Sequence, residues 1–261
     1  MSVDWLLRQA PRPQAKVRLF CFPYAGVGAS VYRLWAAGLP PEVEVCALQL
    51  PGRESRLRET PLPTIAAMVD ALAHALTAHL DKPFAFFGHS MGAIIAAELA
   101  RELPARGLPG PAHLFVSGRR PPGMPGTESP LHELGDEDFV AAIVRRYGGI
   151  PAEVLRDREV MALLLPCLRA DIKALELHRP AQRSPLQIPV TVFGGAEDRL
   201  APLEHLDAWR DETGAGLRVR VFPGDHFYLN PQRTALLAEL TAVLAALVAK
   251  SATPRDSREI A

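Results

Sequence analysis

The sequence has few cysteines and no pairing pattern among them. Only Cys21, Cys46 and Cys167 are present in 261 residues, and no two of them have C-x-x-C spacing. An odd, sparse set of this kind argues against a disulfide framework and against a zinc site. Cys21 and Cys46 fall in apolar runs and Cys167 falls in a helical pattern, so we expect all three to be small packing residues.

An excess of charge of one sign and a long apolar run are also missing. Lys plus Arg equals Asp plus Glu at 29 each, which gives no reason to expect a nucleic-acid or anionic-membrane partner. We find no run of about 18 apolar residues that would span a bilayer. The first 16 residues lack an apolar core followed by a cleavage site, so we expect no signal peptide. These absences predict a cytoplasmic protein.

The sequence does contain short apolar runs that alternate with longer helical patterns. Near-continuous apolar runs are typical of parallel strands covered on both faces. They predict strands over residues 17–22, 43–50, 84–89, 112–117, 189–195 and 217–224. Helical patterns lie at 29–38, 64–80, 91–103, 202–211 and 231–249. This order predicts an α/β fold with a mostly parallel central sheet and helices on both faces.

One long stretch contains no candidate strand. Between residues 121 and 185 the pattern is helical, near 136–147 and 157–178, and we expect an interruption of the second helix at Pro166. A helical insert between two core strands predicts a lid, although helices that only cover the core would give the same pattern. The predicted organisation is a core over 1–120 and 186–250, a helical lid insertion over 121–185, and a disordered tail over 251–261.

One five-residue motif predicts a catalytic nucleophile. Residues 88–92 read Gly-His-Ser-Met-Gly, which matches G-x-S-x-G, and they join a candidate strand to a candidate helix. In that context a sharp turn lifts the serine hydroxyl above the sheet, and the glycines let strand and helix pass closely. The free N–H groups of the helix favour an anionic intermediate. We therefore predict Ser90 as the nucleophile and interpret His89 as a packing or hydrogen-bonding residue.

A serine nucleophile needs a base and an acid that orients the base. In this fold the acid and then the histidine follow the serine along the chain. Among the eight histidines, His226 lies just beyond the last predicted strand, in a loop expected at the same sheet edge as Ser90. Asp198 follows the preceding strand and is predicted to orient His226, with Glu197 as the alternative. Asp225 is discounted because adjacent side chains in a loop rarely face each other.

Two backbone N–H groups are predicted to bind the oxyanion that forms during acyl transfer. One belongs to Met91, at the start of the helix after the nucleophile. The other comes from the loop over residues 22–28, FPYAGVG, where we favour Ala25 over Tyr24. This loop has neither G-x-G-x-x-G nor a P-loop lysine, which argues against a phosphate cradle. The chemistry expected of this set requires neither a metal nor an organic cofactor.

Six longer motifs run through most of the chain, between residues 20 and 229. They read FCFPYAGVGAS, LQLPGRESR, FGHSMGAIIAAELA, HLFVSGRRPP, LLPCLRADIKALE and VFPGDHFYL. Together they resemble the type II thioesterases of polyketide and nonribosomal peptide assembly lines. The resemblance implies an α/β-hydrolase fold with a helical lid, a triad of Ser90, Asp198 and His226, and the two oxyanion donors named above.

The resemblance also implies a substrate and a partner. Family members act on acyl groups held as thioesters on the phosphopantetheine arm of acyl- or peptidyl-carrier proteins, and they release groups that block the synthase. We therefore expect a serine thioesterase that forms an acyl-serine intermediate and acts as a monomer. A carboxylesterase or lipase, and a medium-chain acyl thioesterase of fatty acid synthesis, stay open as alternatives. An inactive carrier-binding module is a further alternative, against which the intact triad argues.

Two departures from the family pattern concern the acyl pocket. The first loop of family members often reads F-P-H-A-G-G, whereas here Tyr24 stands in place of the histidine and Val27 in place of a glycine. We therefore expect Tyr24 to contact the substrate. We also expect the shape of the acyl pocket to differ from that of family members with the F-P-H-A-G-G loop. The insert sequence GMPGTESP, at 123–130, follows no family pattern, so the resemblance leaves the preferred chain length open.

Side chains in and beside the insert are further candidates for substrate contact. Four apolar residues are expected either to line an acyl channel or to pack the insert onto the core: Leu164, Leu165, Ile172 and Leu175. Four arginines are either a docking face for an acidic carrier protein or solvated surface: Arg119, Arg120, Arg145 and Arg146.

Overall fold

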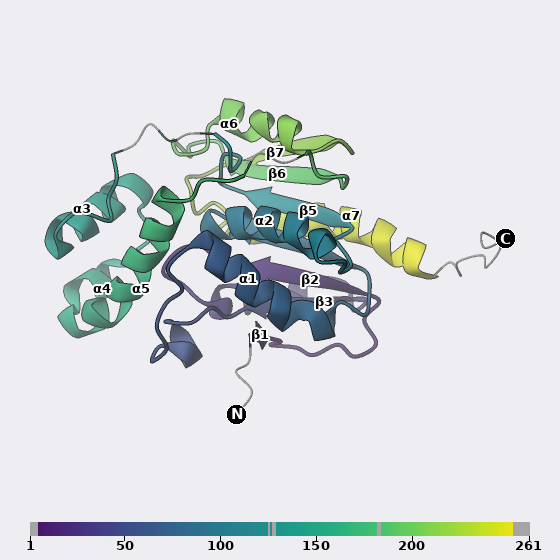
Figure 1. The fold of residues 1–261 in the computed structure, drawn as a ribbon, viewed down its shortest axis with the longest axis horizontal. Coiled ribbons are helices and arrows are strands. Elements are labelled where there is room, and N and C mark those ends of the chain that lie inside the picture. Colours follow the sequence, from purple (N-terminus) through teal and green to yellow (C-terminus); the bar gives the residue numbers. More distant parts are fainter. Residues whose placement is uncertain (1–4, 125, 127–128, 182–183, 253–261) are drawn as a thin grey trace.

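A seven-stranded sheet forms the centre of the molecule (Figure 1). The structure is a computed structural model that describes residues 5–124, 126, 129–181 and 184–252. The sheet order is β1-β3-β2-β4-β5-β6-β7, and β1 alone is antiparallel to its neighbour. The strands are β1 Leu6–Leu7, β2 Val17–Phe22, β3 Val43–Leu48, β4 Phe84–His89, β5 His113–Ser117, β6 Val190–Gly195 and β7 Leu217–Phe222. The predicted α/β fold with a mostly parallel sheet is confirmed, and the two-residue edge strand β1 is the addition.

Helices cover both faces of the sheet because neighbouring strand residues point to opposite sides. On one face, α1 (Ile65–Leu76) and α2 (Met91–Ala105) pack in a buried cluster with Phe86. On the other face, the adjacent Phe87 packs in a second cluster with α7 (Arg233–Ala252). The short helix α6 (Leu203–Asp207) belongs to the first face through Leu206. Strands β3 to β6 are therefore buried along their whole length, which is why their sequences show little alternation. The edge strand β7 differs, since it reads LRVRVF and exposes Arg218 and Arg220.

The predicted helix over 29–38 forms as two short 3-10 helices instead, Ala29–Tyr32 and Ala36–Gly38. Tyr32 ends the first of these helices, Trp35 lies between the two, and both side chains are buried. Gly38 lies so close to α7 that an added Cβ would come within 2.5 Å of Leu237 Cδ1. The packing of these residues decides the local conformation, and the apolar pattern alone does not reveal it.

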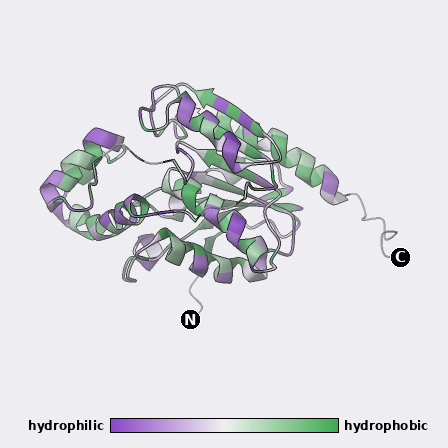
Figure 2. Cartoon of the chain, turned by 45° about the horizontal axis from the view of Figure 1, so that its top comes forward, coloured by the Kyte–Doolittle hydropathy of each residue, from purple (hydrophilic) through white to green (hydrophobic). Residues whose placement is uncertain are grey.

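The C-terminal helix α7 differs from two expectations. Its residues Arg233–Ser251 are long and apolar enough to cross a membrane by length and composition alone, and Figure 2 shows the helix as largely hydrophobic. The expectation that no run is long enough to span a bilayer therefore does not hold for this helix. One face of α7 is buried in the second cluster through Leu236, Leu237, Leu240 and Leu244, which make up the 22% of the apolar window that is buried. The helix ends two residues beyond the predicted core boundary, and 253–261 of the predicted tail lie outside the described residues.

Three helices lie between β5 and β6 in the chain and are grouped at one end of the sheet (Figure 1). They are α3 (Asp136–Tyr147), α4 (Ala152–Arg156) and α5 (Arg158–Glu176). The prediction of an interruption at Pro166 is wrong, since α5 continues through it. A proline there leaves the carbonyl of Ala162 without its helical donor, but both residues are exposed, so water can bind that carbonyl. Part of the insert motif at 123–130 lies outside the described residues.

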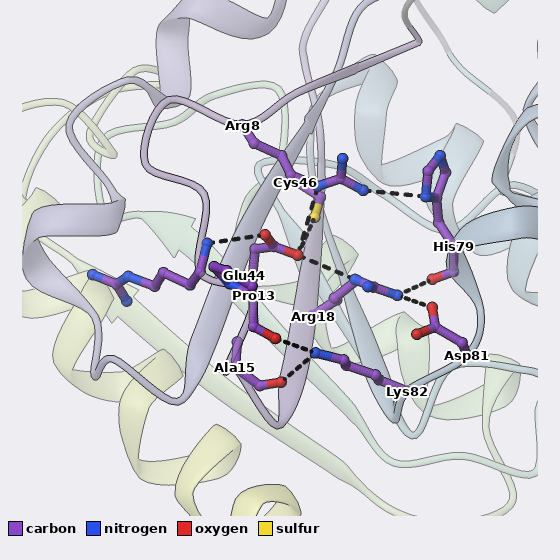
Figure 3. Close-up of polar contacts among 10 residues, drawn as sticks. Arg8, Pro13, Ala15, Arg18, Glu44, Cys46, His79, Asp81 and Lys82 are labelled. Carbon is purple, nitrogen blue, oxygen red and sulfur yellow. Dashed lines mark hydrogen bonds and ion pairs between the residues drawn. The ribbon is translucent and has the colours of Figure 1, made fainter.

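A buried carboxylate ties the start of the chain to the amino-terminal end of the sheet (Figure 3). Glu44, at the beginning of β3, is 5% exposed. It accepts the backbone N–H of Arg12 at 3.1 Å and the Nε of Arg18 at 3.1 Å. Arg8 Nε lies 3.6 Å from the same carboxylate. Burial tends to raise the pKa of Glu44, but these donors and charges outweigh it and the pKa is lowered.

The three cysteines are buried and free, as packing residues are expected to be. Cys21 and Cys46 lie on neighbouring strands but belong to the clusters on opposite faces of the sheet. Burial raises the pKa of Cys46 to about 11 and that of Cys167 to about 12. At neutral pH these thiols are therefore protonated.

Candidate active site

The turn between β4 and α2 holds Ser90 in a strained backbone conformation. Its φ of 53° lies in the left-handed region, which costs a non-glycine residue about 1–3 kcal/mol. The Ser90 N–H donates to the carbonyl of Ser117 at 2.8 Å, which fixes the turn to β5. An added Cβ would come within 2.1 Å of a backbone oxygen at Gly88 and within 2.0 Å of one at Gly92. The two glycines therefore permit the close passage of strand and helix that the motif predicts.

His226 and Asp198 lie side by side beyond the ends of β7 and β6. His226 Nδ1 is 2.8 Å from Asp198 Oδ2, and both residues are 5% exposed. Because an ionised carboxylate only accepts, this contact places a proton on Nδ1 and leaves Nε2 as the basic atom. The Leu200 N–H donates to Asp198 Oδ1 at 2.9 Å and orients the carboxylate further. The competing Glu197 is exposed.

Asp225 is occupied elsewhere, within its own loop. Its Oδ1 accepts the Phe227 N–H at 2.8 Å. The same loop approaches β6 so closely that an added Cβ at Gly195 would lie 2.3 Å from the carbonyl oxygen of Asp225. This close approach brings the loop that carries His226 against the loop that carries Asp198.

His89 forms part of a buried polar chain behind His226. Its Nδ1 is 2.8 Å from Ser117 Oγ, which is 2.6 Å from the hydroxyl of Tyr228. The His89 and His226 rings lie 4.9 Å apart. Burial, and then the neighbouring His226, lower the pKa of His89 well below its ordinary value, so its ring is neutral at pH 7. The interpretation of His89 as a packing and hydrogen-bonding residue fits these contacts. Ser117 and Tyr228 stand in the motifs HLFVSGRRPP and VFPGDHFYL, although neither was predicted to be a site residue.

Ser90 and His226 line one cavity of about 160 Å³. Its remaining wall is mostly apolar and comes from the first loop, from the insert and from Phe227. Three of the four apolar candidates from the insert line it: Leu164, Ile172 and Leu175. Leu165 instead packs in the cluster around Phe139. Leu168 and Tyr147 also line the cavity. Leu168 could have been predicted, because it lies four residues from both Leu164 and Ile172 on the same face of the helix.

The loop over 22–28 reaches this cavity because β2 is paired with β4 in the sheet. Phe22 lies opposite Gly88 in that register, and Ala25 lines the cavity together with Ser90. The Gly26 N–H donates to Asp171 Oδ2 at 2.8 Å and is already engaged. Among the described residues no hydrogen-bond acceptor is recorded for the Ala25 N–H. Met91 begins α2, where the first N–H groups have no partner within the helix.

Tyr24 lies in the wall of the same cavity. Its ring makes edge contacts with His89 at 5.6 Å and with Phe227 at 5.1 Å between centroids. Burial raises the pKa of its hydroxyl, and a hydrogen bond with Asn230 opposes that shift. Tyr24 is thus held in place by its neighbours, and part of its surface faces the cavity that contains Ser90 and His226.

A second cavity, of about 330 Å³, adjoins the first. The two share Tyr147, Ile172 and Leu175 as lining residues. Three of the four candidate arginines line the second cavity: Arg119, Arg120 and Arg146. Arg145 is exposed. No group of three or more His, Cys, Asp or Glu side chains within the described part of the chain is arranged to hold a metal ion.

Comparison with known proteins identifies the family. The thioesterase domain model matches residues 17–244. The gramicidin S biosynthesis protein GrsT of Aneurinibacillus migulanus is 43% identical over 225 residues, which cover 86% of this chain and 88% of that protein. The medium-chain S-acyl fatty acid synthase thioesterase of Rattus norvegicus is 36% identical and covers 83% of each chain.

A solved structure agrees with these sequence matches. The RedJ thioesterase from the prodiginine pathway of Streptomyces coelicolor superposes with a TM-score of 0.83 at 42% identity, over 89% of this chain and 92% of that one. The fold, the sequence matches and the strand–turn–helix around Ser90 therefore all indicate the same family. The chain belongs to the thioesterase domain family, and it is a thioester hydrolase with the α/β-hydrolase fold.

Proposed function

We propose that this thioesterase releases acyl groups from the phosphopantetheine arm of acyl- or peptidyl-carrier proteins, through an acyl-Ser90 intermediate. The observation that carries the proposal is a single cavity with Ser90 and His226 at one side and an apolar wall from the insert at the other. Relatives named for gramicidin S and prodiginine biosynthesis support a role beside a nonribosomal peptide or polyketide synthase. We place the enzyme in the cytoplasm, acting as a monomer.

The first half of the reaction forms the acyl-enzyme. His226 Nε2 takes the proton of Ser90 Oγ while this oxygen attacks the thioester carbonyl carbon, and Asp198 stabilises the imidazolium that results. The N–H groups of Ala25 and Met91 donate to the oxyanion. The carbon–sulfur bond then breaks, His226 returns its proton to the pantetheine sulfur, and the acyl group stays on Ser90.

The second half releases the product. His226 takes a proton from water, which attacks the acyl-Ser90 carbonyl, and the same two N–H groups bind the second oxyanion. The bond to Ser90 Oγ breaks, and His226 protonates this oxygen. A carboxylic acid leaves and the free enzyme is restored. The whole cycle uses groups of this chain and one water.

The insert supplies two features that suit a carrier-bound substrate. Its helices give the acyl cavity its apolar wall, as a lid over residues 121–185 would. The second cavity is lined by four arginines and by one carboxylate, Glu176, which lies 3.8 Å from Arg146. This excess of positive charge suits the phosphate of a pantetheine arm or the acidic surface of a carrier protein.

A direct test follows the acyl load of a carrier protein. Acetyl-, hexanoyl- and dodecanoyl-carrier proteins are incubated with the enzyme and analysed by mass spectrometry, beside the matching acyl-coenzyme A and nitrophenyl esters. We expect carrier thioesters to be cleaved with the highest kcat/KM. A preference for nitrophenyl esters over every thioester would instead indicate an esterase. A sharp optimum at dodecanoyl-carrier would favour the fatty-acid role that the rat relative suggests.

The volume of the acyl cavity predicts a short acyl group. Its 160 Å³ resembles the volume of about 150 Å³ that holds one benzene molecule in an apolar protein cavity. An acyl chain of about six carbons is therefore the expected upper size for a good substrate.

Enlarging the cavity is expected to shift this preference. Leu164 lines the cavity, so Leu164→Ala makes room for additional methylenes, each of which contributes about tenfold in an apolar pocket. We expect the ratio of kcat/KM for octanoyl- over butanoyl-carrier to rise about tenfold. Leu163→Ala is the matched control, because Leu163 is 57% exposed on the same helix. Equal ratios in both variants would show that the chain does not occupy this cavity.

A further inference from the structure

Three sequence motifs that the triad does not explain meet beside the acyl cavity. They are the loop FPYAGVGAS, the segment LQLPGRESR after β3, and LLPCLRADIKALE within α5. The sequence separates them widely, since Arg53 and Asp171 stand 118 positions apart. In the structure, side chains from the second and third motifs hold the backbone of the first.

Arg53 and Asp171 form a buried, bidentate ion pair. Arg53 Nη1 donates to Asp171 Oδ2 at 2.7 Å and Nη2 donates to Oδ1 at 3.0 Å. The side chains are 2% and 0% exposed. Arg53 is itself fixed, because its Nε donates to the carbonyl of Pro51 at 3.2 Å. A pair with this geometry holds the carboxylate in one place and one orientation.

The Asp171 carboxylate also accepts a backbone N–H from the oxyanion loop. Gly26 N donates to Asp171 Oδ2 at 2.8 Å. This bond fixes the peptide plane between Ala25 and Gly26, directly after the N–H group that we assign to the oxyanion. Gly26 has a φ of 78°. Because glycine adopts positive and negative φ about equally readily, the residue itself does not fix this conformation. The acceptor on Asp171 therefore decides which way the loop faces.

The segment after β3 holds the other end of the same loop. The Ala29 N–H donates to Gln49 Oε1 at 2.8 Å, and the Ser30 N–H donates to Glu54 Oε2 at 3.2 Å. Gln49 Nε2 donates in turn to the carbonyl of Arg53 at 2.8 Å. Arg53 Nη1 also donates to the Val27 carbonyl at 3.4 Å, a contact that both double variants below remove equally. The loop is thus anchored at 26, 27, 29 and 30, and Ala25 lies just outside the first anchor.

The helix that carries Asp171 also forms the wall of the acyl cavity. Leu168 and Ile172, three residues before and one residue after Asp171, line the cavity. An added Cβ on Gly26 would come within 2.8 Å of Leu168 Cδ1, so α5 and the loop are in direct contact. A movement of this part of α5 therefore moves the wall of the cavity and the acceptor of Gly26 together.

We propose that Asp171, held by Arg53, is a positioning residue that aims the Ala25 N–H at the oxyanion and couples the oxyanion loop to the acyl-binding wall. This inference rests on the proposed oxyanion role of Ala25. A buried ion pair is a poor means of stabilising a fold, since apolar residues of similar volume often hold two elements together as well. Apolar residues, however, offer no acceptor to Gly26. The charge pair serves to place that acceptor.

Two double variants separate positioning from stability. Arg53→Met/Asp171→Leu removes the ion pair and the acceptor, whereas Arg53→Met/Asp171→Asn removes the ion pair but keeps a side-chain oxygen for Gly26. Losing one oxyanion donor costs about 10²–10³ in kcat. We expect kcat of the leucine variant to fall by about 10², with KM for an acyl-carrier within about threefold of wild type, and the asparagine variant to recover at least about tenfold of that loss.

Binding of a tetrahedral mimic gives a second readout that a structural role would not move. An alkylboronic acid adds to a serine Oγ as an anion, so its affinity for the leucine variant should fall in parallel with kcat, while affinity for the carboxylic acid product is retained. Glu59→Gln is the control, since Glu59 forms a two-pronged pair with Arg56 in the same segment but is 40% exposed. It is expected to keep wild-type kcat.

Equal kcat in the two double variants, or wild-type kcat in the leucine variant, overturns the inference. If the leucine variant does not fold, Asp171→Glu decides, because it keeps the charge but displaces the oxygen from Gly26. We expect at least about a tenfold loss of kcat there, and wild-type kcat refutes the inference. A wild-type enzyme that cleaves no carrier thioester contradicts the proposed function instead.

Discussion

Replacing Ser90 by alanine is expected to lower kcat for thioester hydrolysis by about 10⁶-fold, the loss typical of a removed serine nucleophile. The acyl group then has no oxygen to which it can be transferred, and direct attack by water is slow. The backbone strain at φ 53° is the same for alanine as for serine, so the thermal unfolding midpoint should stay near that of the wild type. Single-turnover kinetics on an acyl-carrier, followed by mass spectrometry, measures the loss.

Labelling with a fluorophosphonate gives an independent check on the same residue. The wild type should gain one label per chain and the Ser90→Ala variant none. Ser55→Ala is the control, because Ser55 is exposed in the 3-10 helix Glu54–Arg56, none of whose residues lines the cavity. It should keep both label and activity. Substantial hydrolysis by a folded Ser90→Ala variant would refute the assignment of the nucleophile.

Replacing Asp198 by asparagine is expected to lower kcat by about 10⁴-fold. The side chain keeps its size, but its amide can donate to His226 Nδ1 and so favours the tautomer with the proton on Nε2. In that tautomer Nε2 cannot accept the proton of Ser90. Because the site geometry is retained, KM for the acyl-carrier should change little, and steady-state kinetics on hexanoyl-carrier separates the two constants.

Glu197 provides the matched control for this experiment. It precedes Asp198 directly, carries the same charge and is exposed. Glu197→Gln should therefore retain kcat within about twofold, as surface substitutions away from the site generally do. If the losses were reversed, with Glu197→Gln inactive and Asp198→Asn active, Glu197 would be the orienting acid.

The parts of the molecule that could be predicted from sequence are those that a local pattern specifies. Strands β3 to β6 are buried on both faces and so form near-continuous apolar runs. The strand and helix around Ser90 surround a motif whose glycines have a steric reason. His226 and Asp198 could be proposed because each follows the end of a strand, and parallel strands end at one edge of the sheet.

The parts that could not be predicted depend on contacts between distant segments. Nothing local to Arg53 indicates that its partner is Asp171 on an insert helix, or that the two hold the Gly26 N–H. Likewise, Pro166 predicts a helix break until its exposure is known. The pattern at 29–38 does not reveal that this segment forms two short 3-10 helices. These features follow from tertiary packing, which overrides local preference.

The state of the three cysteines bears on the side reactions of this enzyme. In the proposed reaction each turnover liberates a pantetheine thiol. A reactive thiol on the enzyme would compete with water by accepting the acyl group, or would form a mixed disulfide with the arm. Here Cys167 lies one residue from the cavity wall at Leu168, yet it is buried and its thiol stays protonated. Since only a thiolate exchanges rapidly, we expect Cys167 neither to accept the acyl group nor to form a mixed disulfide with the released pantetheine thiol.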